Sequence, residues 1–318
     1  MNILITGVGG FIGFNLARNL LKKSNIIVYG IDNLSNSSLE KIRLLKKNKK
    51  FKFILNDCSK NFLSIDKKID VIYHLASGKI PRYGGAQKLI LSSIQSIKNI
   101  SSIWEKNNCK LIYASTSDVY GKNRKVPFKE SSDFHYGSFK KTRWSYASTK
   151  LLIENILITH AKEKKLNLNI VRFFGTYGPY HSISWKAGPQ SVFIENIINN
   201  KKIEIHGDGK QTRCFTYIND TVKGLIKLIN YKKNKIFNFG SNEEISIKNL
   251  STEIIKLLKR NGYNKIIYIP YENFKNYEDV QKRIPSSALA EKEIGVLFNT
   301  SLVNGLKKTI KWQRNREY

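Results

Sequence analysis

Residues 2–13 read NILITGVGGFIG, a short apolar run followed by a glycine-rich turn. The run predicts a buried strand, and the apolar periodicity of residues 14–21 predicts a helix directly after the turn. Gly7 permits a tight turn, Gly10 lets the backbone approach a pyrophosphate, and Gly13 permits close packing of helix on strand. The G-x-x-G-x-x-G spacing differs from the commonest dinucleotide fingerprint, so the interpretation as a phosphate-binding turn depends on the neighbouring strand and helix.

The next apolar run, residues 26–31, ends in Asp32, about 20 residues beyond the glycines. At that place in a strand-helix-strand unit, a carboxylate can accept hydrogen bonds from both ribose hydroxyls of an adenosine and repel a 2′-phosphate. We therefore expect NAD rather than NADP as the cofactor. The alternative is that Asp32 only caps the turn formed by residues 32–35.

Strands and helices are predicted to alternate along the first half of the chain, which indicates an α/β fold with a doubly wound parallel Rossmann sheet. The further strands are expected at 51–55, 71–74, 110–114 and 169–173. A loop rich in Ser, Gly, Trp and Pro, residues 180–190, should open a smaller C-terminal α/β lobe. Its elements are expected at 191–199, 203–206, 246–260 and 302–312. We expect residues 1–178 to form the Rossmann domain, with 219–240 returning to it, and residues 179–318 to form the smaller lobe.

Three residues in the middle of the chain indicate redox chemistry on an alcohol. Thr116 lies in ASTSDVYG (114–121), and Tyr146 precedes Lys150 by four residues in YASTK. Residues four apart share one face of a helix and can point into one cleft. Tyrosine ionises near pH ~10 in water, and we expect the lysine ammonium, with a cationic nicotinamide ring, to lower the tyrosine pKa toward the working pH. Tyr146 could then act as a base; the alternative is a solvated helix face.

Composition limits the other classes of function. The chain has 318 residues, 41% of them hydrophobic, and a net charge of +31. The lysines are dispersed in small groups and no nucleic-acid module is visible, so a nucleic-acid partner is not favoured. No apolar run approaches the ~18 residues that span a bilayer, and the first strand begins at Asn2, so we expect a cytoplasmic protein without a signal peptide. The cysteines and histidines lack metal-binding spacing, which predicts no metal site and reduced thiols.

Further short motifs occur in a fixed order along nearly the whole chain: Asp57, HLAS (74–77), RFFGTYGP (172–179), GDGKQTR (207–213), YIND (217–220) and QKR (281–283). With these motifs the chain resembles the extended short-chain dehydrogenase/reductase family, specifically its NAD-dependent sugar-nucleotide epimerases, dehydratases and decarboxylases. The resemblance implies a Rossmann domain that holds NAD and a smaller lobe that holds a nucleoside diphosphate sugar. It also implies that a hydride is removed from sugar carbon 4.

The resemblance assigns roles residue by residue. Thr116 should hydrogen-bond the reacting sugar oxygen, Tyr146 should take the proton from the carbon-4 hydroxyl, and Lys150 should hold the nicotinamide ribose and lower the tyrosine pKa. Besides Tyr146 and Lys150, the implied cofactor contacts are Gly7, Gly10, Phe11, Ile12, Gly13, Asp32, Asn33, Asp57, Cys58, Leu75, Ala76, Ser77, Lys79 and Tyr177. The implied substrate contacts are Thr116, Ser117, Gly175, Val192 and two arginines that would clamp the diphosphate, Arg213 and Arg283. For each arginine a surface ion pair is the alternative.

The residues after Thr116 bear on which reaction comes after the oxidation. Dehydratases and decarboxylases of this family usually carry glutamate two positions on, and one type of hexose dehydratase also needs an acid between; this chain has Ser117 and Asp118. We count Asp118 among the candidate catalytic residues and expect a 4-epimerase of a nucleoside diphosphate hexose or hexuronate, most simply a UDP-sugar. Lys79 resembles a lysine near the cofactor of galactose-type 4-epimerases. RWSY (143–146) instead resembles a motif of UDP-glucuronate decarboxylases, so a decarboxylase or a 4,6-dehydratase remains an alternative.

Two further points are the expected oligomeric state and the alternative of a protein without catalytic activity. In this family the helices around 89–105 and 144–162 pair with their twins, so we expect a homodimer through a four-helix interface. The apolar positions expected on that surface are Ile97, Ile100, Leu151 and Ile158. A catalytically silent member that binds NAD or RNA is a further alternative, which the presence of Thr116, Tyr146 and Lys150 disfavours.

Overall fold

A parallel sheet of seven strands organises the protein, whose computed structural model describes residues 1–60, 65–78, 85–138, 140–141, 143–185, 187–273 and 278–315. The strand order is β11-β6-β5-β4-β1-β2-β3. The strands are β1 (Asn2–Thr6), β2 (Ile27–Asp32), β3 (Phe51–Leu55), β4 (Val71–His74), β5 (Lys110–Thr116), β6 (Asn167–Phe173) and β11 (Lys235–Phe239). All of these pairings are parallel, and the order reverses beside β1, as in a doubly wound sheet. The predicted fold class is confirmed.

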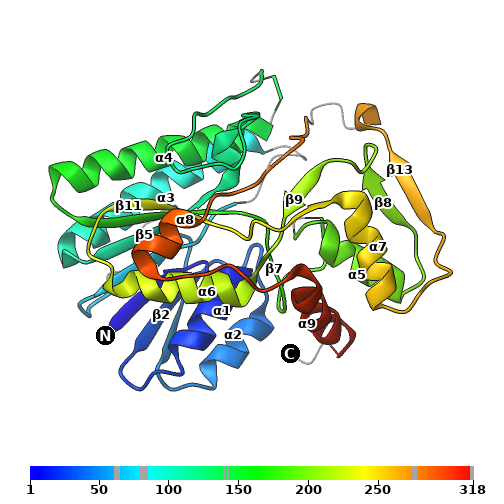
Figure 1. Cartoon of the computed structure of the whole chain (residues 1–318). Coiled ribbons are helices and arrows are strands. Elements are labelled where there is room, and N and C mark those ends of the chain that lie inside the picture. Colours follow the sequence, from blue (N-terminus) through cyan, green and yellow to red (C-terminus); the bar gives the residue numbers. More distant parts are fainter. Residues whose placement is uncertain are drawn as a thin grey trace.

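Helices cover both faces of this sheet (Figure 1). One face carries α3 (Ala86–Asn107) and α4 (Arg143–Glu163), whose apolar side chains pack on the sheet in one core cluster. The other face carries α1 (Phe11–Leu20), α2 (Leu39–Lys46), α6 (Ile218–Lys227) and α8 (Ala288–Ile294). Because both faces are covered, the strands are apolar almost throughout rather than alternating, and every residue of β4 is buried.

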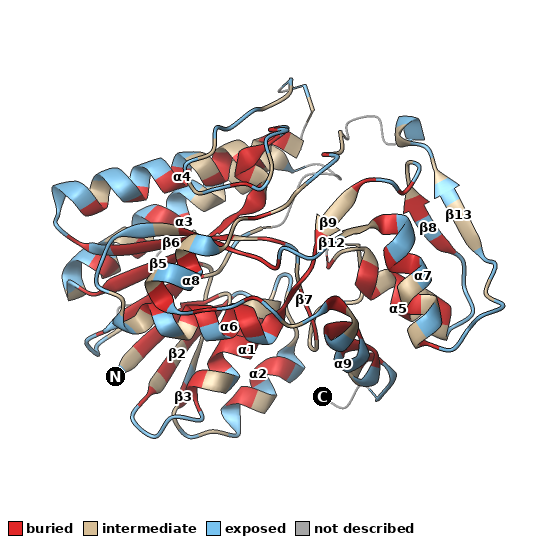
Figure 2. Cartoon of the chain, viewed as in Figure 1, coloured by how far each residue is buried: buried red, intermediate tan, exposed pale blue. Residues whose placement is uncertain are grey.

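The smaller elements lie beyond the carboxyl ends of the central strands (Figure 1). They comprise α5 (Pro189–Ile198), α7 (Ile247–Leu257) and α9 (Leu302–Asn315), with three strand pairs: β7 (Thr176–Tyr177) with β10 (Thr216–Tyr217), β8 (Ile203–His206) with β13 (Ile266–Ile269), and β9 (Thr212–Cys214) with β12 (Glu244–Ser246). Short 3-10 turns lie at Ser117–Tyr120 (η1), Leu228–Asn230 (η2) and Tyr271–Asn273 (η3). One apolar cluster joins this part to the sheet, since Phe193 and Leu306 belong to the same core as Ile3. Buried residues accordingly occur in α5 and α9 as well as in the central strands (Figure 2).

Segment 218–239 runs from the smaller elements back to the main sheet. The helix α6 packs against α1, and β11 pairs in register with β6. Most predicted elements differ from the observed ones by only one to three residues at their ends. The helix α1, for example, begins at Phe11 rather than residue 14 because Gly10 already serves as its N-cap.

The predicted outer surface of α3 and α4 was wrong in part. Ile97 is only 3% exposed and Ile100 0%, because both lie on the turn of α3 that faces the sheet. Leu151 is half-buried, and Ile158 is exposed as expected. The apolar side chains that do face outward are Leu91, Ile94, Leu152, Ile156 and Ile158. Among the helices in the described ranges, none is both long and apolar enough to cross a membrane.

Candidate active site

The glycine-rich turn connects β1 to α1 at the carboxyl edge of the sheet. Gly7 has φ +70, and a Cβ there would lie 2.8 Å from the Ala76 nitrogen. A Cβ on Gly13 would lie 2.3 Å from the Gly7 carbonyl oxygen, so neither position accepts a side chain. Gly10 is the N-cap of α1, and because it is a glycine, no side chain of the cap accepts hydrogen bonds from the first amides of the helix. These amides and the helix dipole suit an anionic diphosphate, which fits the expected dinucleotide.

Asp32 closes β2 beside this turn. Its Oδ2 accepts a hydrogen bond from the Gly9 amide at 2.9 Å, and its Oδ1 accepts from the Leu34 amide at 2.8 Å and the Ser37 hydroxyl at 2.7 Å. The carboxylate therefore does cap the following turn. A carboxylate oxygen can accept two hydrogen bonds, so Oδ2 retains capacity for a ribose hydroxyl and both interpretations of Asp32 are compatible.

The residues that follow β2 and β3 lie next to Asp32. Asn33 donates to Asp57 at 2.9 Å, joining the ends of β2 and β3. Burial acts to raise the pKa of Asp57, but hydrogen bonds from Ser59 and Asn33 lower it below the usual value, so this group stays ionised. Cys58 is buried, and burial raises the pKa of its thiol to about 12. Its thiol is therefore a neutral packing group rather than a reactive one.

Residues 75–77 come directly after β4 and lie against the glycine turn. The Ala76 amide donates to the Thr6 hydroxyl at 3.2 Å, which fixes this loop beside Gly7. Lys79 lies outside the described residues. Tyr177 does not join the group: its side chain is fully buried, and its hydroxyl donates to the Leu302 carbonyl of α9 at 3.2 Å. Aromatic neighbours Phe215 and Tyr217 hold it in the core.

Thr116, Tyr146 and Lys150 converge where β5 meets α4. Thr116 is the last residue of β5, and a side-chain hydrogen bond links it to Tyr146. Lys150 lies one turn further along α4 and donates to the Ala114 carbonyl at 2.7 Å. The three side chains therefore come from one strand end and one helix face, as the spacing predicted.

The charges around Tyr146 differ from the expected ones. Burial, followed by the Asp118 carboxylate, raises the pKa of Tyr146, while Thr116 and Arg283 act to lower it. Lys150 donates to the Ala114 carbonyl, and burial lowers the pKa of Lys150 itself to about 7, so near neutral pH it carries less positive charge than the ammonium that we expected to lower the tyrosine pKa. In the protein alone, Tyr146 is therefore a protonated phenol.

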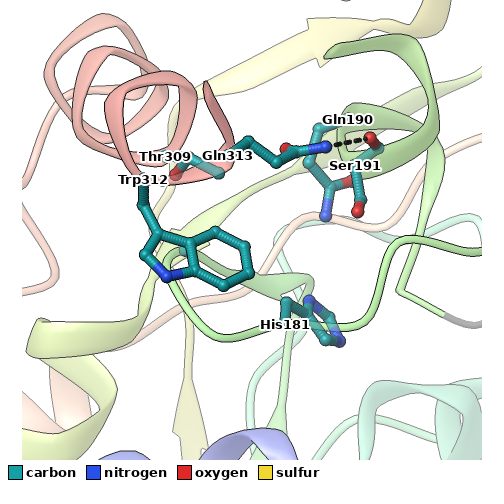
Figure 3. A pocket seen from close by; sticks show the side chains of 7 residues that line it. His181, Gln190, Ser191, Thr309, Trp312 and Gln313 are labelled. Atoms are coloured by element: carbon teal, nitrogen blue, oxygen red, sulfur yellow. Dashed lines mark hydrogen bonds between the residues drawn. The ribbon is translucent and has the colours of Figure 1, made fainter. Parts of the chain in front are cut away.

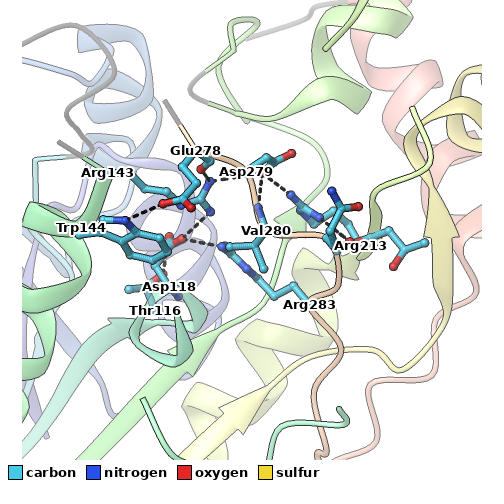
Figure 4. Close-up of polar contacts among 11 residues, drawn as sticks. Thr116, Asp118, Arg143, Trp144, Arg213, Glu278, Asp279, Val280 and Arg283 are labelled. Carbon is cyan, nitrogen blue, oxygen red and sulfur yellow. Dashed lines mark hydrogen bonds and ion pairs between the residues drawn. The ribbon is translucent and has the colours of Figure 1, made fainter. Parts of the chain in front are cut away.

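Five charged side chains form a cluster beside Thr116 (Figure 4). Asp118 Oδ1 lies 2.8 Å from Arg283 and 3.3 Å from Arg143, and Asp118 Oδ2 accepts from Thr116 at 3.2 Å. Asp279 Oδ1 lies 2.7 Å from Arg213 and 3.2 Å from Arg143. Arg213 and Arg283 therefore both form ion pairs, which was the alternative considered for each. These are not pairs on the outer surface, because the two side chains are only 19% and 14% exposed.

Segment 278–283 brings two members of this cluster, Asp279 and Arg283, to α4 and η1. Glu278 pairs with Lys122 at 2.9 Å and accepts from the Trp144 indole at 3.1 Å, and its backbone carbonyl accepts from Arg143 at 2.7 Å. The opposing arginines lower the pKa of the buried Asp279 well below its usual range, against the effect of burial. Neither acid was singled out from the sequence, because a single acid in a loop carries no pattern.

The other expected substrate contacts are scattered. Ser117 is buried in η1, Val192 is half-buried in α5, and Gly175 has φ +47 with its α-carbon against the Cys214 carbonyl. A Cβ on Gly175 would lie 2.3 Å from that oxygen, so a close backbone approach accounts for this glycine.

The loop of residues 180–190 is anchored on both sides. His181 stacks on Phe11 of the glycine turn with ring centroids 3.9 Å apart. Ser191 donates to the Ser182 carbonyl at 2.9 Å, and Gln313 of α9 donates to the Ser191 carbonyl at 2.9 Å (Figure 3). The loop therefore connects the start of α1 to the last helix, α9.

Comparisons with known proteins agree with this geometry. The model of the NAD dependent epimerase/dehydratase family matches residues 3–240. A UDP-N-acetyl-alpha-D-glucosaminuronate decarboxylase of Bacillus cytotoxicus is 33% identical over 99% of this chain and 98% of its own length. UDP-glucuronic acid decarboxylase 1 of Arabidopsis thaliana is 27% identical over 99% of this chain and 70% of its own. A UDP-glucuronic acid 4-epimerase of Bacillus cereus, solved with UDP-glucuronic acid and NAD, is 27% identical, with a TM-score of 0.87 and 100% of both chains covered.

Proposed function

The chain belongs to the NAD-dependent epimerase/dehydratase family and is an NAD-dependent nucleotide-sugar enzyme, and we propose that it is a 4-epimerase of a UDP-hexuronate. The observation that carries the choice of reaction is the pairing of Asp118 with both Arg143 and Arg283. A 4,6-elimination needs one group to remove the proton at carbon 5 and another to protonate the leaving hydroxyl. Ser117 supplies no acid, and Asp118 is held as an ion-paired anion, so oxidation and return of the hydride is the reaction best supported.

The residues divide the oxidation between them. Tyr146 takes the proton of the carbon-4 hydroxyl as the carbon–hydrogen bond of carbon 4 breaks, and Thr116 holds that oxygen in line with the phenol. Bound NAD⁺ supplies the acceptor for the hydride and a positive charge that favours the phenolate. Lys150 holds the nicotinamide ribose, Asp32 the adenosine ribose, and the first amides of α1 the pyrophosphate.

A hexuronate is favoured by charge and by the relatives. The two decarboxylases and the B. cereus epimerase act on UDP-linked uronic acids according to their names. Arg143 and Arg283 pair with Asp118 beside Thr116, and Arg213 joins the cluster through Asp279 (Figure 4). Guanidinium groups in this cluster suit both the diphosphate and a sugar carboxylate. We propose a uridine diphosphate as the nucleotide part of the substrate because these relatives act on UDP-linked sugars according to their names.

One NMR experiment tests the reaction. The purified protein is incubated with UDP-glucuronate, UDP-N-acetylglucosaminuronate, UDP-glucose, UDP-N-acetylglucosamine and dTDP-glucose, and the products are identified. A carbon-4 epimer of a UDP-hexuronate without net reduction of NAD is the expected result. A 4-keto-6-deoxy sugar contradicts the proposal and makes Asp118 an elimination base.

Decarboxylation is the second candidate, and two observations favour it. Arg143 and Trp144 both contact segment 278–283 at the site, and the decarboxylase of B. cytotoxicus is 33% identical to this chain. A 4-keto hexuronate is a β-keto acid, which loses carbon dioxide without a base at carbon 5. A UDP-pentose and released carbon dioxide in the same experiment identify this reaction instead.

A further inference from the structure

A buried polar network lies next to Thr116 and Lys150, between α4 and the strands β5, β6 and β11. Its centre is the ion pair between Glu154 and Arg172, whose side chains are each 2% exposed. Arg172 donates to both oxygens of Glu154, from Nη2 at 2.6 Å and from Nε at 3.0 Å. Arg172 Nη1 also donates to the Tyr120 hydroxyl at 2.8 Å, and Tyr120 donates to Asn238 of β11 at 2.7 Å. The network thus joins α4 to the strands β6 and β11.

Glu154 also contacts the strand that carries Thr116. Glu154 Oε1 accepts a short hydrogen bond from the hydroxyl of Ser115. The two neighbours of Ser115 on β5 are Ala114, whose carbonyl accepts from Lys150, and Thr116 itself. Glu154 therefore fixes the single strand end that supports two of the three catalytic side chains.

The surroundings of Lys150 make the same carboxylate its anionic neighbour. The groups that act on the ammonium are Tyr113 and His74 of the sheet and Glu154 of α4. Burial keeps His74 and Tyr113 neutral, since it lowers the pKa of His74 to about 3 and raises that of Tyr113. Glu154 lies one helical turn beyond Lys150 and opposes the loss of its charge.

We propose that Glu154 is a positioning residue of the oxidation site, which fixes the end of β5 through Ser115 and supplies the negative charge one helical turn beyond Lys150. This inference rests on the proposed function, because it presumes that Thr116 and Lys150 take part in the oxidation. A purely structural ion pair is the competing explanation. In that case Glu154 would matter only through its bond to Arg172 and the stability of the fold.

The test begins with Glu154→Gln, which removes the charge, keeps one oxygen that can accept from Ser115, and replaces the other oxygen, an acceptor of Arg172, with an amide. We expect kcat for the UDP-hexuronate to fall at least tenfold while KM changes less than twofold. The high-pH limb of the kcat profile should move down by about one pH unit, because Lys150 loses its proton more readily without the carboxylate. The matched control is Glu130→Gln, which removes a carboxylate on the far side of Arg172, where Glu130 accepts from the Asn238 amide at 2.8 Å. Its kcat and pH profile should equal those of the unmodified protein.

A second measurement does not depend on turnover. In protein labelled with ¹³C at the lysine ε-carbon, the Lys150 signal is the one absent from Lys150→Met, and its pH titration reports the charge directly. We expect a lower titration midpoint in Glu154→Gln than in the unmodified protein or in Glu130→Gln. Equal midpoints together with equal kcat values would overturn the proposal.

The double variant Glu154→Gln/Arg172→Met covers the possibility that the single variant folds poorly. Removing both partners of a buried ion pair is commonly far less harmful than removing one. If the double variant recovers thermal stability but not kcat, Glu154 acts on the site. If kcat returns with stability, the ion pair is structural and the proposal fails. Lack of turnover by the unmodified protein on any nucleotide sugar refutes the proposed function, while the lysine titration still tests the charge of Lys150.

Discussion

The two ends of the proposed site, where we expect the cofactor and the substrate to bind, are built in different ways. The cofactor end consists of backbone from a few short segments: a glycine turn, a helix start and the ends of β2, β3 and β4. The substrate end consists of side chains, with Asp118, Arg143, Arg213, Asp279 and Arg283 drawn from separate parts of the chain. A backbone cradle depends on shape and changes little with pH, whereas an ion-pair cluster depends on charge and must rearrange when an anionic ligand enters.

Breaking the ion-pair cluster should have the largest effect on stability. Asp279→Asn leaves Arg143 and Arg213 without the carboxylate they share, and we expect unfolding free energy at pH 7 to fall by about 3 kcal/mol. Because the folded-state pKa of Asp279 is depressed, its contribution is present above its unfolded pKa and is lost as pH falls through the folded value. Urea unfolding at several pH values should therefore show the two proteins converging in acid. Glu278→Gln is the control; its ion pair with Lys122 is partly exposed, so we expect a loss below about 1 kcal/mol.

Tyr146→Phe tests whether Tyr146, which we place between cofactor and substrate, is the base of the oxidation. The variant should bind NAD nearly as well as the unmodified protein but turn over about a hundredfold more slowly or worse, the usual scale for losing a positioned acid-base group. Steady-state assays with the accepted UDP-sugar and fluorescence titration with NADH measure the two quantities. Unchanged turnover would remove the base assignment.

Gly13→Ala tests whether the cradle depends on shape alone. A methyl group at 2.3 Å from the Gly7 carbonyl must push α1 away from the turn, at a cost of about 2 kcal/mol in stability and a marked loss of NAD affinity. Gly262→Ala is the matched control, because no atom lies within 4 Å of the added carbon. Thermal unfolding with and without NAD compares them, and equal behaviour of the two variants would contradict the role of Gly13.

Asp32→Ala should have a smaller and selective effect. We expect NAD affinity to fall about tenfold, the scale of losing roughly 1.4 kcal/mol of binding, while NADP affinity falls less or rises. Isothermal titration with both cofactors gives the ratio. If discrimination is unchanged, Asp32 serves only the turn that its bonds to Leu34 and Ser37 already support.

The smallest effect on the folded chain is expected from the proposed dimer surface. Leu152 and Ile156 are 48% and 38% exposed and lie one turn apart on α4, where a second copy would cover them. Light scattering at micromolar concentration should give a dimer, and Leu152→Arg with Ile156→Arg should give a monomer. Leu297→Arg, at a residue 51% exposed elsewhere, should leave the dimer intact. A monomeric unmodified protein refutes this proposal.

The predicted elements succeeded where the signal was local. Apolar runs of strand length placed β1, β3 and β4 at their observed bounds. The central strand β4 is buried throughout because both faces of the sheet are covered, whereas the edge strand β3 is exposed at Lys52 and Leu55. The outer surface of α3 was less predictable. Ile97 and Ile100 belong to a helix that is apolar on more than one face, and only the packing against the sheet decides which face is buried.

By itself the sequence determined the parallel sheet, the glycine turn, the Tyr146 and Lys150 pair and the family, because each depends on residues a few positions apart. Only the tertiary structure decided that Lys150 donates to the Ala114 carbonyl and that Tyr177 is buried in the core. It also decided that Asp118 and Asp279 form ion pairs with the arginines of the site. It also joined Glu154 to Ser115, although a carboxylate one turn after Lys150 was visible in the sequence. Contacts between distant segments, and the pKa shifts that burial causes, depend on how the elements pack, and no local pattern encodes that.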